Sequence, residues 1–360
     1  MTAVESQASP QLCDPPPHNQ EREACSSIKP AGFFIRHPPA PHLLNSFITP
    51  DSQLFQTIHM GAAVVNLEKW MLVVDGLVSH PFSVTLADLY KFPKTTVTAF
   101  HECYGSPVKP PVENLWRVGN VEWTGVRLNT LLSLASPLPE AQFVWSEGLD
   151  HGEFHGVIAD RYQKDLPLTK AIQTEVLVAY ELNGRPLSKE RGGPVRLVVP
   201  GWFGTNSTKW LSKLSLQTGR AMGPYTTTFY NSVDQDDPLK TMKPVWAVEP
   251  NSMIVKPSPG EEIEGPKVHV EGWAWSHDGI KIVQVSLDEG KSWQDSQVGS
   301  MKGYSWQEFS VEANIPPSLS GEITIIVRAT STSGMTQKDA GRRNHVHRIT
   351  VKVKNRIFSA

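Results

Sequence analysis

The amino-acid sequence predicts an α+β domain with a mixed sheet, followed by a smaller β-sandwich. Its 360 residues exceed what one hydrophobic core usually serves, which favours two domains. Helix and strand patterns are mixed without regular alternation as far as Pro250, and this argues against a doubly wound sheet. Beyond Pro250 no helical pattern recurs, and short strands follow one another between turn signals. We therefore expect a flexible leader at residues 1–29, a larger domain at 30–245 and a sandwich at 246–356.

The leader is rich in Pro, Ser, Gln and charged residues, a composition that buries too little apolar surface to order itself. It lacks the apolar core of a secretory signal and the Arg-rich pattern of a mitochondrial presequence. No stretch of the chain is apolar for the length that a membrane span requires. We therefore expect a cytoplasmic protein with no recognisable targeting signal and no membrane partner.

Composition and charge describe an ordinary globular protein. The apolar fraction is 39% and the formal net charge is −2, with Lys and Arg scattered along the chain. This charge disfavours nucleic acid as a partner. The cysteines Cys13, Cys25 and Cys103 are too few and too unevenly placed for a disulfide framework, which points to a reducing compartment.

The first half of the larger domain leads to a cysteine at the end of a strand. Residues 70–78 are an apolar run interrupted by Asp-Gly, and Thr85 stands three residues before Asp88, which together predict a strand, a turn and a short helix. A second strand at residues 95–100 runs directly to Cys103, and the Gly and Pro that follow require a loop. We therefore expect Cys103 to face a site built from loops.

The remaining elements follow from apolar periodicity and turn signals. Residues 126–134 have helical spacing, and short apolar runs predict strands at 143–145, 175–181 and 194–199. A Pro-rich joint at 244–266 leads into the sandwich. Within the sandwich the turn at 288–291 indicates a hairpin. The strands expected there are 268–273, 280–287, 306–311, 323–330 and 348–354.

Cys103 and four basic residues are the candidates for chemistry. A lone cysteine at the end of a strand is often only a small buried apolar residue. However, Arg36, Arg191, Arg196 and Lys209 border apolar segments, where burying a cation without an anionic partner is costly. Guanidinium groups match the geometry of phosphates and oxyanions. The four residues therefore predict a phosphate-bearing cofactor and an oxyanion substrate; the alternative is that each pairs with a local carboxylate.

Seven segments then occur in one order between residues 32 and 353. They are 33–37 (FFIRH), 102–105 (ECYG), 122–126 (EWTGV), 148–150 (GLD), 179–184 (AYELNG), 192–201 (GGPVRLVVPG) and 207–211 (STKWL). Each is weak alone, but together they resemble the sulfite oxidase and sulfite dehydrogenase family of molybdopterin-dependent oxidoreductases. The resemblance implies a mixed-sheet molybdopterin-binding domain followed by an immunoglobulin-like β-sandwich that makes a homodimer.

The same resemblance implies a molybdenum–molybdopterin cofactor with Cys103 as the one protein thiolate ligand, since soft sulfur suits that metal. It places Arg36 against the oxyanion and Tyr162 where it donates to the reacting centre. It also makes Trp116 a wall of the substrate pocket. The alternatives are a surface position for Tyr162 and a simple core position for Trp116. The cofactor-binding residues implied are Phe34, Arg36, His37, Cys103, Asp150, Arg191, Arg196, Ser207, Thr208 and Lys209.

The sequence departs from the family pattern after Cys103. The family commonly has Asn and then Arg after the Cys-x-Gly, whereas Ser106, Pro107 and Val108 stand here. One anion-binding arginine is therefore missing from its usual place, and Lys109 is a candidate replacement. Arg191 also stands where a histidine is common, and His37 where an asparagine is common. The cofactor-binding segments are thus preserved better than the sulfite pocket.

The resemblance predicts oxidation of sulfite to sulfate by oxygen-atom transfer. The sequence carries no haem-binding module and no Cys-x-x-Cys-His, so electrons are expected to leave to a separate acceptor or to dioxygen. The pairs His151/His155 and His345/His347 have no third ligand at a suitable spacing. Two alternatives stay open: the same cofactor acting on another small substrate, and a protein that keeps the fold without redox turnover.

Overall fold

The computed structural model describes residues 9–106, 116–233, 238–317, 321–339 and 343–354. The chain divides into two compact units, each made of three segments. The large unit comprises Met1–Arg36, Gln56–Val97 and Glu122–Trp246, and the second unit comprises His37–Phe55, Thr98–Val121 and Ala247–Ala360. Residues 37–55 and 98–121 thus fold with the C-terminal segment of the chain rather than with their sequence neighbours. None of the helices in the described ranges is long and apolar enough to cross a bilayer.

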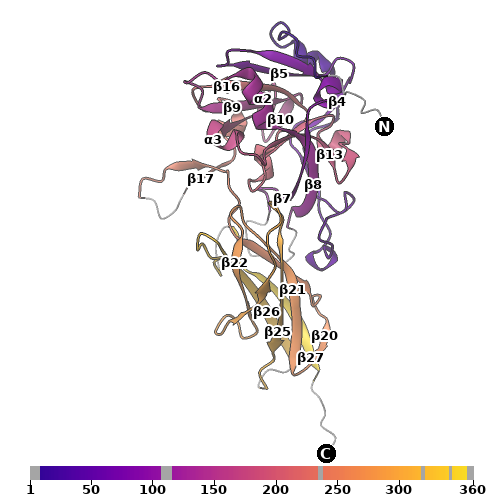
Figure 1. Cartoon of the computed structure of the whole chain (residues 1–360). Coiled ribbons are helices and arrows are strands. Elements are labelled where there is room, and N and C mark those ends of the chain that lie inside the picture. The colour runs from indigo at the N-terminus through magenta and orange to yellow at the C-terminus, as the bar shows by residue number, and fades with distance from the viewer. Residues whose placement is uncertain (1–8, 107–115, 234–237, 318–320, 340–342, 355–360) are drawn as a thin grey trace, which may run out of the picture. The chain divides into compact units, whose positions relative to one another are not determined.

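The large unit is built on a five-stranded mixed sheet with the order β12-β9-β16-β5-β6. Strands β16 and β5 pair in parallel and the other neighbours pair antiparallel, which confirms the predicted mixed sheet (Figure 1). The Asp-Gly pair that interrupts the apolar run marks the end of β5, where Gly76 has a φ of 85°. The strands are β5 (Met71–Gly76), β6 (Phe82–Thr85), β9 (Phe143–Gly148), β12 (Gln163–Pro167) and β16 (Leu211–Gln217).

A second sheet carries the strands that lead to and from Cys103. Its order is β14-β13-β8-β7, and β15 also pairs with β13. The strands pass each other closely at Gly125, where a Cβ atom would lie 2.1 Å from the carbonyl oxygen of Val178. The bounds are β7 (Lys94–Glu102), β8 (Val118–Arg127), β13 (Leu177–Leu182), β14 (Arg185–Pro186) and β15 (Arg196–Val198).

The helices of the large unit are short. They are α1 (Leu86–Leu89), α2 (Leu128–Ala135), α3 (Leu168–Ala171) and α4 (Pro224–Thr227). Thr85 caps α1 as predicted, because its hydroxyl accepts from the backbone N–H of Asp88 over 3.2 Å. The helix expected at 126–134 begins only at Leu128, since residues 126 and 127 still belong to β8.

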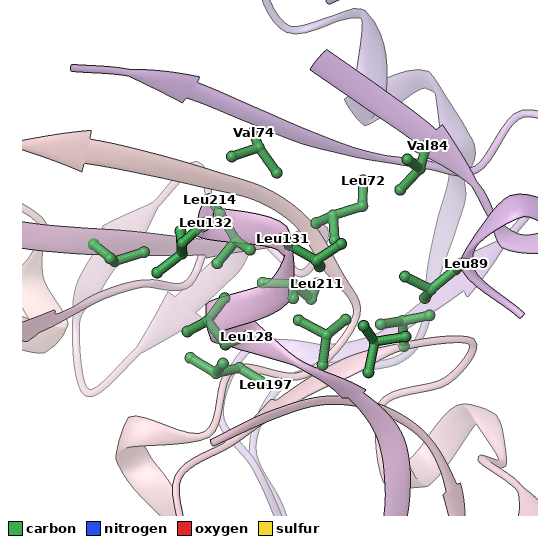
Figure 2. Packing of buried hydrophobic residues seen from close by; sticks show 14 of the residues in the cluster. Leu72, Val74, Val84, Leu89, Leu128, Leu131, Leu132, Leu197, Leu211 and Leu214 are labelled. Carbon is green, nitrogen blue, oxygen red and sulfur yellow. The ribbon is translucent and has the colours of Figure 1, made fainter. Parts of the chain in front are cut away.

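Helix α2 supplies the apolar face on which the sheet packs. Leu128, Leu131 and Leu132 project from it among Leu72 and Leu214 of the sheet (Figure 2). All five side chains are almost completely buried. Burial of one such leucine stabilises the fold by about 2 kcal/mol, so the apolar face of α2 is a main contributor to this core.

The end of the predicted leader is ordered, which corrects the expectation of a flexible segment up to residue 29. A 3-10 helix, η1 (Gln20–Ala24), buries Ala24 in the core, and β1 (Cys25–Ala31) pairs with β4 (Gly61–Val65). The composition missed this because the polar side chains of β1 stay outside while its backbone completes a ladder. The other short pairs are β2 (Phe34–Arg36) with β3 (Gln56–Ile58), β10 (Gly152–Phe154) with β11 (Val157–Ala159), and β17 (Asn231–Val233) with β18 (Met242–Pro244).

The C-terminal segment folds into the predicted β-sandwich. Two sheets enclose one apolar core that includes Val283, Phe309, Ile325 and Val351 (Figure 1). The predicted hairpin joins β22 to β23 through residues 288–291, where Glu289 and Gly290 take positive φ angles. The strands of the first sheet are β19 (Asn251–Lys256), β21 (Lys267–Trp275), β25 (Gln307–Asn314) and β24 (Gln297–Val298). Those of the second are β20 (Glu262–Glu264), β27 (His347–Lys354), β26 (Gly321–Ser331), β22 (Ile280–Ser286) and β23 (Gln294–Asp295).

The remaining two segments of the second unit are fastened to this sandwich by tryptophans. The indole of Trp273 donates to the carbonyl of Leu44 over 2.6 Å, and that of Trp306 donates to the carbonyl of Phe47 over 3.0 Å. The two indoles stack with ring centroids 4.7 Å apart. In the segment Thr98–Val121, the side-chain oxygen of Asn120 accepts from the backbone N–H of Trp306. The sandwich therefore holds the segment that carries Cys103.

Candidate functional site

Cys103 is the first residue after β7, as the sequence predicts, and it is half-buried. Its backbone N–H donates to the carbonyl of Arg117 over 2.9 Å, and its carbonyl accepts from the N–H of Ser106 over 2.9 Å. The N–H of Gly105 points at the sulfur from 3.3 Å. The thiol is thus held in a tight turn that directs one N–H group, that of Gly105, at the sulfur, an arrangement that suits a thiolate.

A guanidinium group lies beside this sulfur. Nη1 of Arg117 is 3.8 Å from Sγ of Cys103. Arg117 immediately precedes β8 and follows the described part of the Cys103 turn only after the segment 107–115. The candidate replacement Lys109 lies outside the described residues, as do Pro107 and Val108.

The residues on both sides of the Cys103 turn are tied to one side chain of the sandwich, Asn251 of β19. Its amide nitrogen donates to Glu102 over 3.4 Å, and its oxygen accepts from the indole of Trp116 over 3.3 Å. Glu102 also accepts from the indole of Trp275 over 2.8 Å, and burial raises the pKa of this carboxyl to about 7. Trp116 is 3% exposed and packs edge-on against His347. Through its hydrogen bond to Asn251, Trp116 therefore anchors the Cys103 turn to β19 within the second unit. Its role as a wall of the substrate pocket stays a prediction.

Three predicted cations gather in the large unit, and we call Arg191, Arg196 and Lys209 the cationic cluster. Arg196 is 4% exposed and its guanidinium donates to the carbonyls of Arg191 and Ser207 over 3.1 and 3.0 Å. It also lies 4.8 Å from the ring centroid of Trp123. Within the described part of the chain no carboxylate pairs with it. Burial, and then the charge of Arg191, lowers the pKa of Arg196 to about 9.

The loops that carry the cluster interlock, so that its members cannot move independently. The N–H of Trp210 donates to the carbonyl of Gly192 over 2.9 Å. Gly192 has a φ of 90°, and a Cβ atom there would lie 2.4 Å from Cγ of Lys209. The ammonium of Lys209 donates to the carbonyl of Thr57 over 2.7 Å. Only glycine at position 192 lets the lysine lie against the loop that begins with Arg191.

Two predicted hydroxyl residues border the cluster. The hydroxyl oxygen of Ser207 accepts from the N–H of Val199 over 3.1 Å, which leaves its own proton available to a ligand. The hydroxyl of Thr208 lies 2.7 Å from that of Ser146, and Thr208 is fully buried. Ser207 thus contacts Arg196 through its carbonyl, and Thr208 immediately precedes Lys209; their role in binding a cofactor stays a prediction.

Asp150 is the predicted acid of the site and is 3% exposed. Burial raises the pKa of this carboxyl, and the charges of Lys209 and Arg22 act in the opposite direction. Its Oδ1 atom is buried without a hydrogen-bond partner among the residues described. Such an acceptor is costly unless a ligand supplies a donor.

Tyr162 lies next to Asp150 and is 6% exposed, which rules out the surface alternative. Its hydroxyl donates to the carbonyl of Thr205 over 2.6 Å and lies 2.9 Å from the hydroxyl of the same residue. Its ring centroid is 4.3 Å from that of Tyr225 and 5.8 Å from that of His59. The Nε2 atom of His59 contacts the hydroxyl of Tyr230. Tyr162 is therefore part of a buried aromatic group.

The predicted residues Phe34 and Arg36 lie on β2. Through the pairing of β2 with β3, Ile35 stands opposite Thr57, which accepts from Lys209. The strand pair thus brings Arg36, which is half-buried, to the side of the cationic cluster, while Phe34 is 43% exposed. His37, the next residue, belongs to the second unit together with Cys103 and Trp116.

Sequence reasoning missed four side chains that the fold adds: Arg117, His59, Tyr225 and Lys164. Lys164 is 1% exposed and donates to the carbonyl of Tyr225 over 2.7 Å, and burial lowers its pKa to about 8. No motif contains these residues. One signal was available for Lys164. It stands two residues after Tyr162, and residues two apart in an extended segment share a face, so a cation lies on an otherwise apolar face.

The two histidine pairs, His151/His155 and His345/His347, are expected to lack a third ligand. In the described ranges no group of three or more His, Cys, Asp or Glu side chains could hold a metal ion. Nδ1 of His347 accepts from the backbone N–H of Ile254 over 2.8 Å, so this ring nitrogen is already engaged.

The donor set fits a pterin cofactor that carries a phosphate. A phosphate needs cations without carboxylate partners, and Arg196 is such a cation as far as the described residues go. A pterin ring presents amino and ring N–H donors, and the orphaned Oδ1 of Asp150 is a matching acceptor. Soft sulfur from Cys103 is the ligand type that molybdenum accepts.

Residues 59–225 match the family described as the oxidoreductase molybdopterin binding domain, and residues 242–358 match the Mo-co oxidoreductase dimerisation domain. Fold and site together thus define a molybdopterin-binding oxidoreductase. The chain is 31% identical over 353 residues to the sulfite oxidase of Gallus gallus, covering 91% of this chain and 75% of that one. It belongs to the sulfite oxidase family, as the motifs predict, and molybdenum–molybdopterin is its cofactor.

Two further comparisons agree with this assignment. The mitochondrial sulfite oxidase of Rattus norvegicus is 31% identical over 363 residues, which cover 93% of this chain and 66% of that one. The present chain thus spans slightly less than two thirds of that relative. The crystal structure of the sulfane dehydrogenase SoxCD from Paracoccus pantotrophus superposes with a TM-score of 0.74 at 27% identity, covering 98% of this chain and 93% of the other.

Proposed function

We propose that this protein oxidises sulfite to sulfate at a molybdenum centre whose protein ligand is Cys103. The observation that carries the proposal is the cationic cluster, in which Arg196 is buried without a carboxylate partner among the described residues. Such a cluster is costly unless an anion fills it. The sulfite oxidases among its relatives support sulfite as the substrate.

The large unit would bind the cofactor. Arg191, Arg196 and Lys209 would neutralise its phosphate, and the hydroxyl proton of Ser207 would complete the cradle. Asp150 would accept from the pterin through its orphaned oxygen. When bound, the cofactor supplies the two-electron redox centre and the oxygen atom that sulfite gains.

The remaining residues would orient the substrate and handle charge. Overall, sulfite and water give sulfate, two protons and two electrons. Tyr162 would supply a phenolic donor that must first leave the carbonyl of Thr205. Arg36 would hold an oxyanion oxygen. Their contribution would be electrostatic, because donors placed in advance stabilise the developing charge without reorganisation.

The proposal also includes the partners and the compartment. The match to a dimerisation domain supports a homodimer. Electrons would leave to a separate acceptor or to dioxygen, which oxygen consumption with and without an added dye acceptor would distinguish. None of the three cysteines is in a disulfide, as in a reducing compartment. Finding the tagged chain by microscopy in mitochondria would contradict a cytoplasmic location.

The test is molybdenum and pterin content together with bleaching of the visible absorption on addition of sulfite. Wild type should contain both and bleach, Cys103→Ser should not bleach, and Cys13→Ser, at an exposed cysteine, should behave as wild type. Loaded protein that does not bleach would discard sulfite and keep the cofactor. Protein without metal and pterin from a host that makes the cofactor would favour a fold without turnover.

One observation favours a second substrate class. One solved structure that covers nearly the whole chain is a sulfane dehydrogenase. A compound with sulfane sulfur, such as thiosulfate, should therefore be tried wherever loaded protein fails to respond to sulfite. Bleaching by thiosulfate alone would replace sulfite in the proposal.

A further inference from the structure

We propose that Arg117 is the group that binds the oxyanion beside Cys103 and thereby determines which substrates reach the thiolate-ligated centre. The inference rests on the proposed function only in taking Cys103 as the position of that centre. It assigns the role to a residue that none of the seven motifs contains.

The first support is the distance between the guanidinium and the sulfur. Nη1 of Arg117 lies 3.8 Å from Sγ of Cys103, and the carbonyl of Arg117 accepts from the N–H of Cys103 over 2.9 Å. The hydroxyl oxygen of Ser106 accepts from the N–H of Arg117 over 3.2 Å. Backbone and side chain of the arginine are thus both fixed relative to the turn that holds the sulfur.

The second support is the space that Gly105 leaves for this side chain. A Cβ atom at Gly105 would lie 2.7 Å from Nη1 of Arg117 and 3.0 Å from Cζ and Nη2. Any larger residue would therefore displace the guanidinium. The turn has the one residue type that lets a cation lie across it next to the thiol.

The third support is that no carboxylate of the described residues pairs with Arg117. Its guanidinium is half-buried, and its contact in the described part of the chain is the sulfur of Cys103. A guanidinium has five N–H donors in a planar fork, so donors remain for two oxygens of a small oxyanion. A sulfite or sulfate ion held by this fork would lie against the sulfur.

Arg343 is a second arginine near the turn among the described residues, and its contacts exclude it from this role. Its guanidinium lies 3.4 Å from the ring centroid of Tyr104 and donates to the carbonyl of the same residue. It also stands close enough to Glu102 to stabilise that carboxylate. Arg343 therefore fastens the turn, whereas Arg117 is left to bind a ligand.

The first experiment probes the charge at Cys103 in the full chain purified without cofactor. Peptide mass spectrometry follows the alkylation of Cys103 by iodoacetate, an anion, and by iodoacetamide, which is neutral. The quantity compared is the iodoacetate rate divided by the iodoacetamide rate. Both reagents attack the thiolate, so a change in the amount of thiolate does not alter this ratio. Arg117→Met should lower this ratio at Cys103 roughly fivefold, the effect of one charge about 4 Å away in water. Exposed Cys13 in the same molecule is the internal control and should not change. In wild type, sulfate should slow the alkylation of Cys103 by iodoacetamide.

The second experiment uses the loaded protein. The dissociation constant of sulfate, read from the visible spectrum, should rise roughly tenfold in Arg117→Met, the loss of one charge-assisted hydrogen bond. Arg117→Lys should restore the alkylation ratio but not the sulfate affinity, because an ammonium has no planar fork. Arg127→Met, at the exposed end of β8, should match wild type in both.

An unchanged sulfate affinity in loaded Arg117→Met would overturn the proposal, whatever the alkylation ratio does. Should that variant lack metal, absence of sulfate protection at Cys103 in wild type would overturn it equally. Failure of sulfite to bleach the wild type would reject the proposed substrate. The proposal that Arg117 binds an oxyanion would then still be tested by the alkylation ratio and the sulfate affinity.

Discussion

The guanidinium of Arg196 donates to the backbone carbonyl of Arg191 over 3.1 Å, so that two buried cations meet at one loop. Without an anion this arrangement is costly for Arg196, because its charge has lost its water and is repelled by that of Arg191. The stability of the loop must therefore depend on what binds there. This relationship leads to the first prediction.

Arg196→Met should separate folding from cofactor binding. The cofactor-free chain should unfold at the same temperature or higher, since an uncompensated buried charge is replaced by an apolar side chain. The same variant should bind the cofactor roughly tenfold more weakly or worse, because it loses charge-assisted hydrogen bonds to the phosphate. Thermal unfolding and molybdenum content measure the two effects. Arg185→Met, at an exposed arginine of β14, should change neither; a lowered unfolding temperature in the Arg196 variant would contradict the argument.

Two tyrosines that lie side by side should respond oppositely to loss of the hydroxyl. The hydroxyl of Tyr225 is buried without a partner among the described residues, whereas that of Tyr162 bonds to Thr205. In the cofactor-free chain Tyr225→Phe should leave the free energy of unfolding unchanged or raise it by up to about 1 kcal/mol. Tyr162→Phe should lower it by about 1 kcal/mol. Urea unfolding of both variants compares them directly, and equal destabilisation would show that Tyr225 has a partner.

Gly192→Ala should damage the cofactor site more than its backbone conformation alone explains. Gly192 and Gly184 both have positive φ angles, but a Cβ atom meets Lys209 at Gly192 and nothing within 4 Å at Gly184. Gly184→Ala should therefore cost only about 1 kcal/mol of backbone strain. The Gly192 variant should lose about 1–3 kcal/mol more through overpacking and should also lose molybdenum. Equal effects of the two variants on stability and metal content would refute the close packing of Lys209.

The buried ring of His347 should make the second unit sensitive to acid. Burial lowers the pKa of His347 from 6.5 to about 3, so between these pH values the unfolded chain binds one proton more than the folded chain. Stability from this group is therefore complete above pH 6.5 and is lost as the pH falls toward 3. The loss is about 2 kcal/mol between pH 6.5 and 5.

His347→Asn tests this, because the amide oxygen can still accept from the N–H of Ile254 while no longer titrating. Urea unfolding across this pH range should give a flatter stability profile for the variant. His80→Asn, at an exposed position, should keep the wild-type slope. An unaltered slope in the His347 variant would mean that other groups carry the acid sensitivity.

The fold was predictable where local periodicity and burial coincide. Alternation placed four of the five predicted sandwich strands to within two residues, for example 280–287 against Ile280–Ser286, whereas the strand expected at 306–311 extends to Asn314. Alternation failed for β16, the central strand of the mixed sheet, because the sequence LSKLSLQ mixes polar and apolar residues. The ammonium of Lys213 is tolerated there since it pairs with Asp75 over 2.7 Å. A pairing across 138 positions cannot be read from either segment alone.

The sequence by itself determined the family, the strand that ends at Cys103, and the basic and hydroxyl residues for a phosphate-bearing cofactor, because these lie in short contiguous motifs. Only the tertiary structure decided that Arg117 lies beside Cys103, that Tyr225 and His59 surround Tyr162, and that Asn251 joins both sides of the cysteine turn. The physical reason is that a motif records local spacing. Contacts between distant segments depend instead on strand register and on which loops the packed cores bring together.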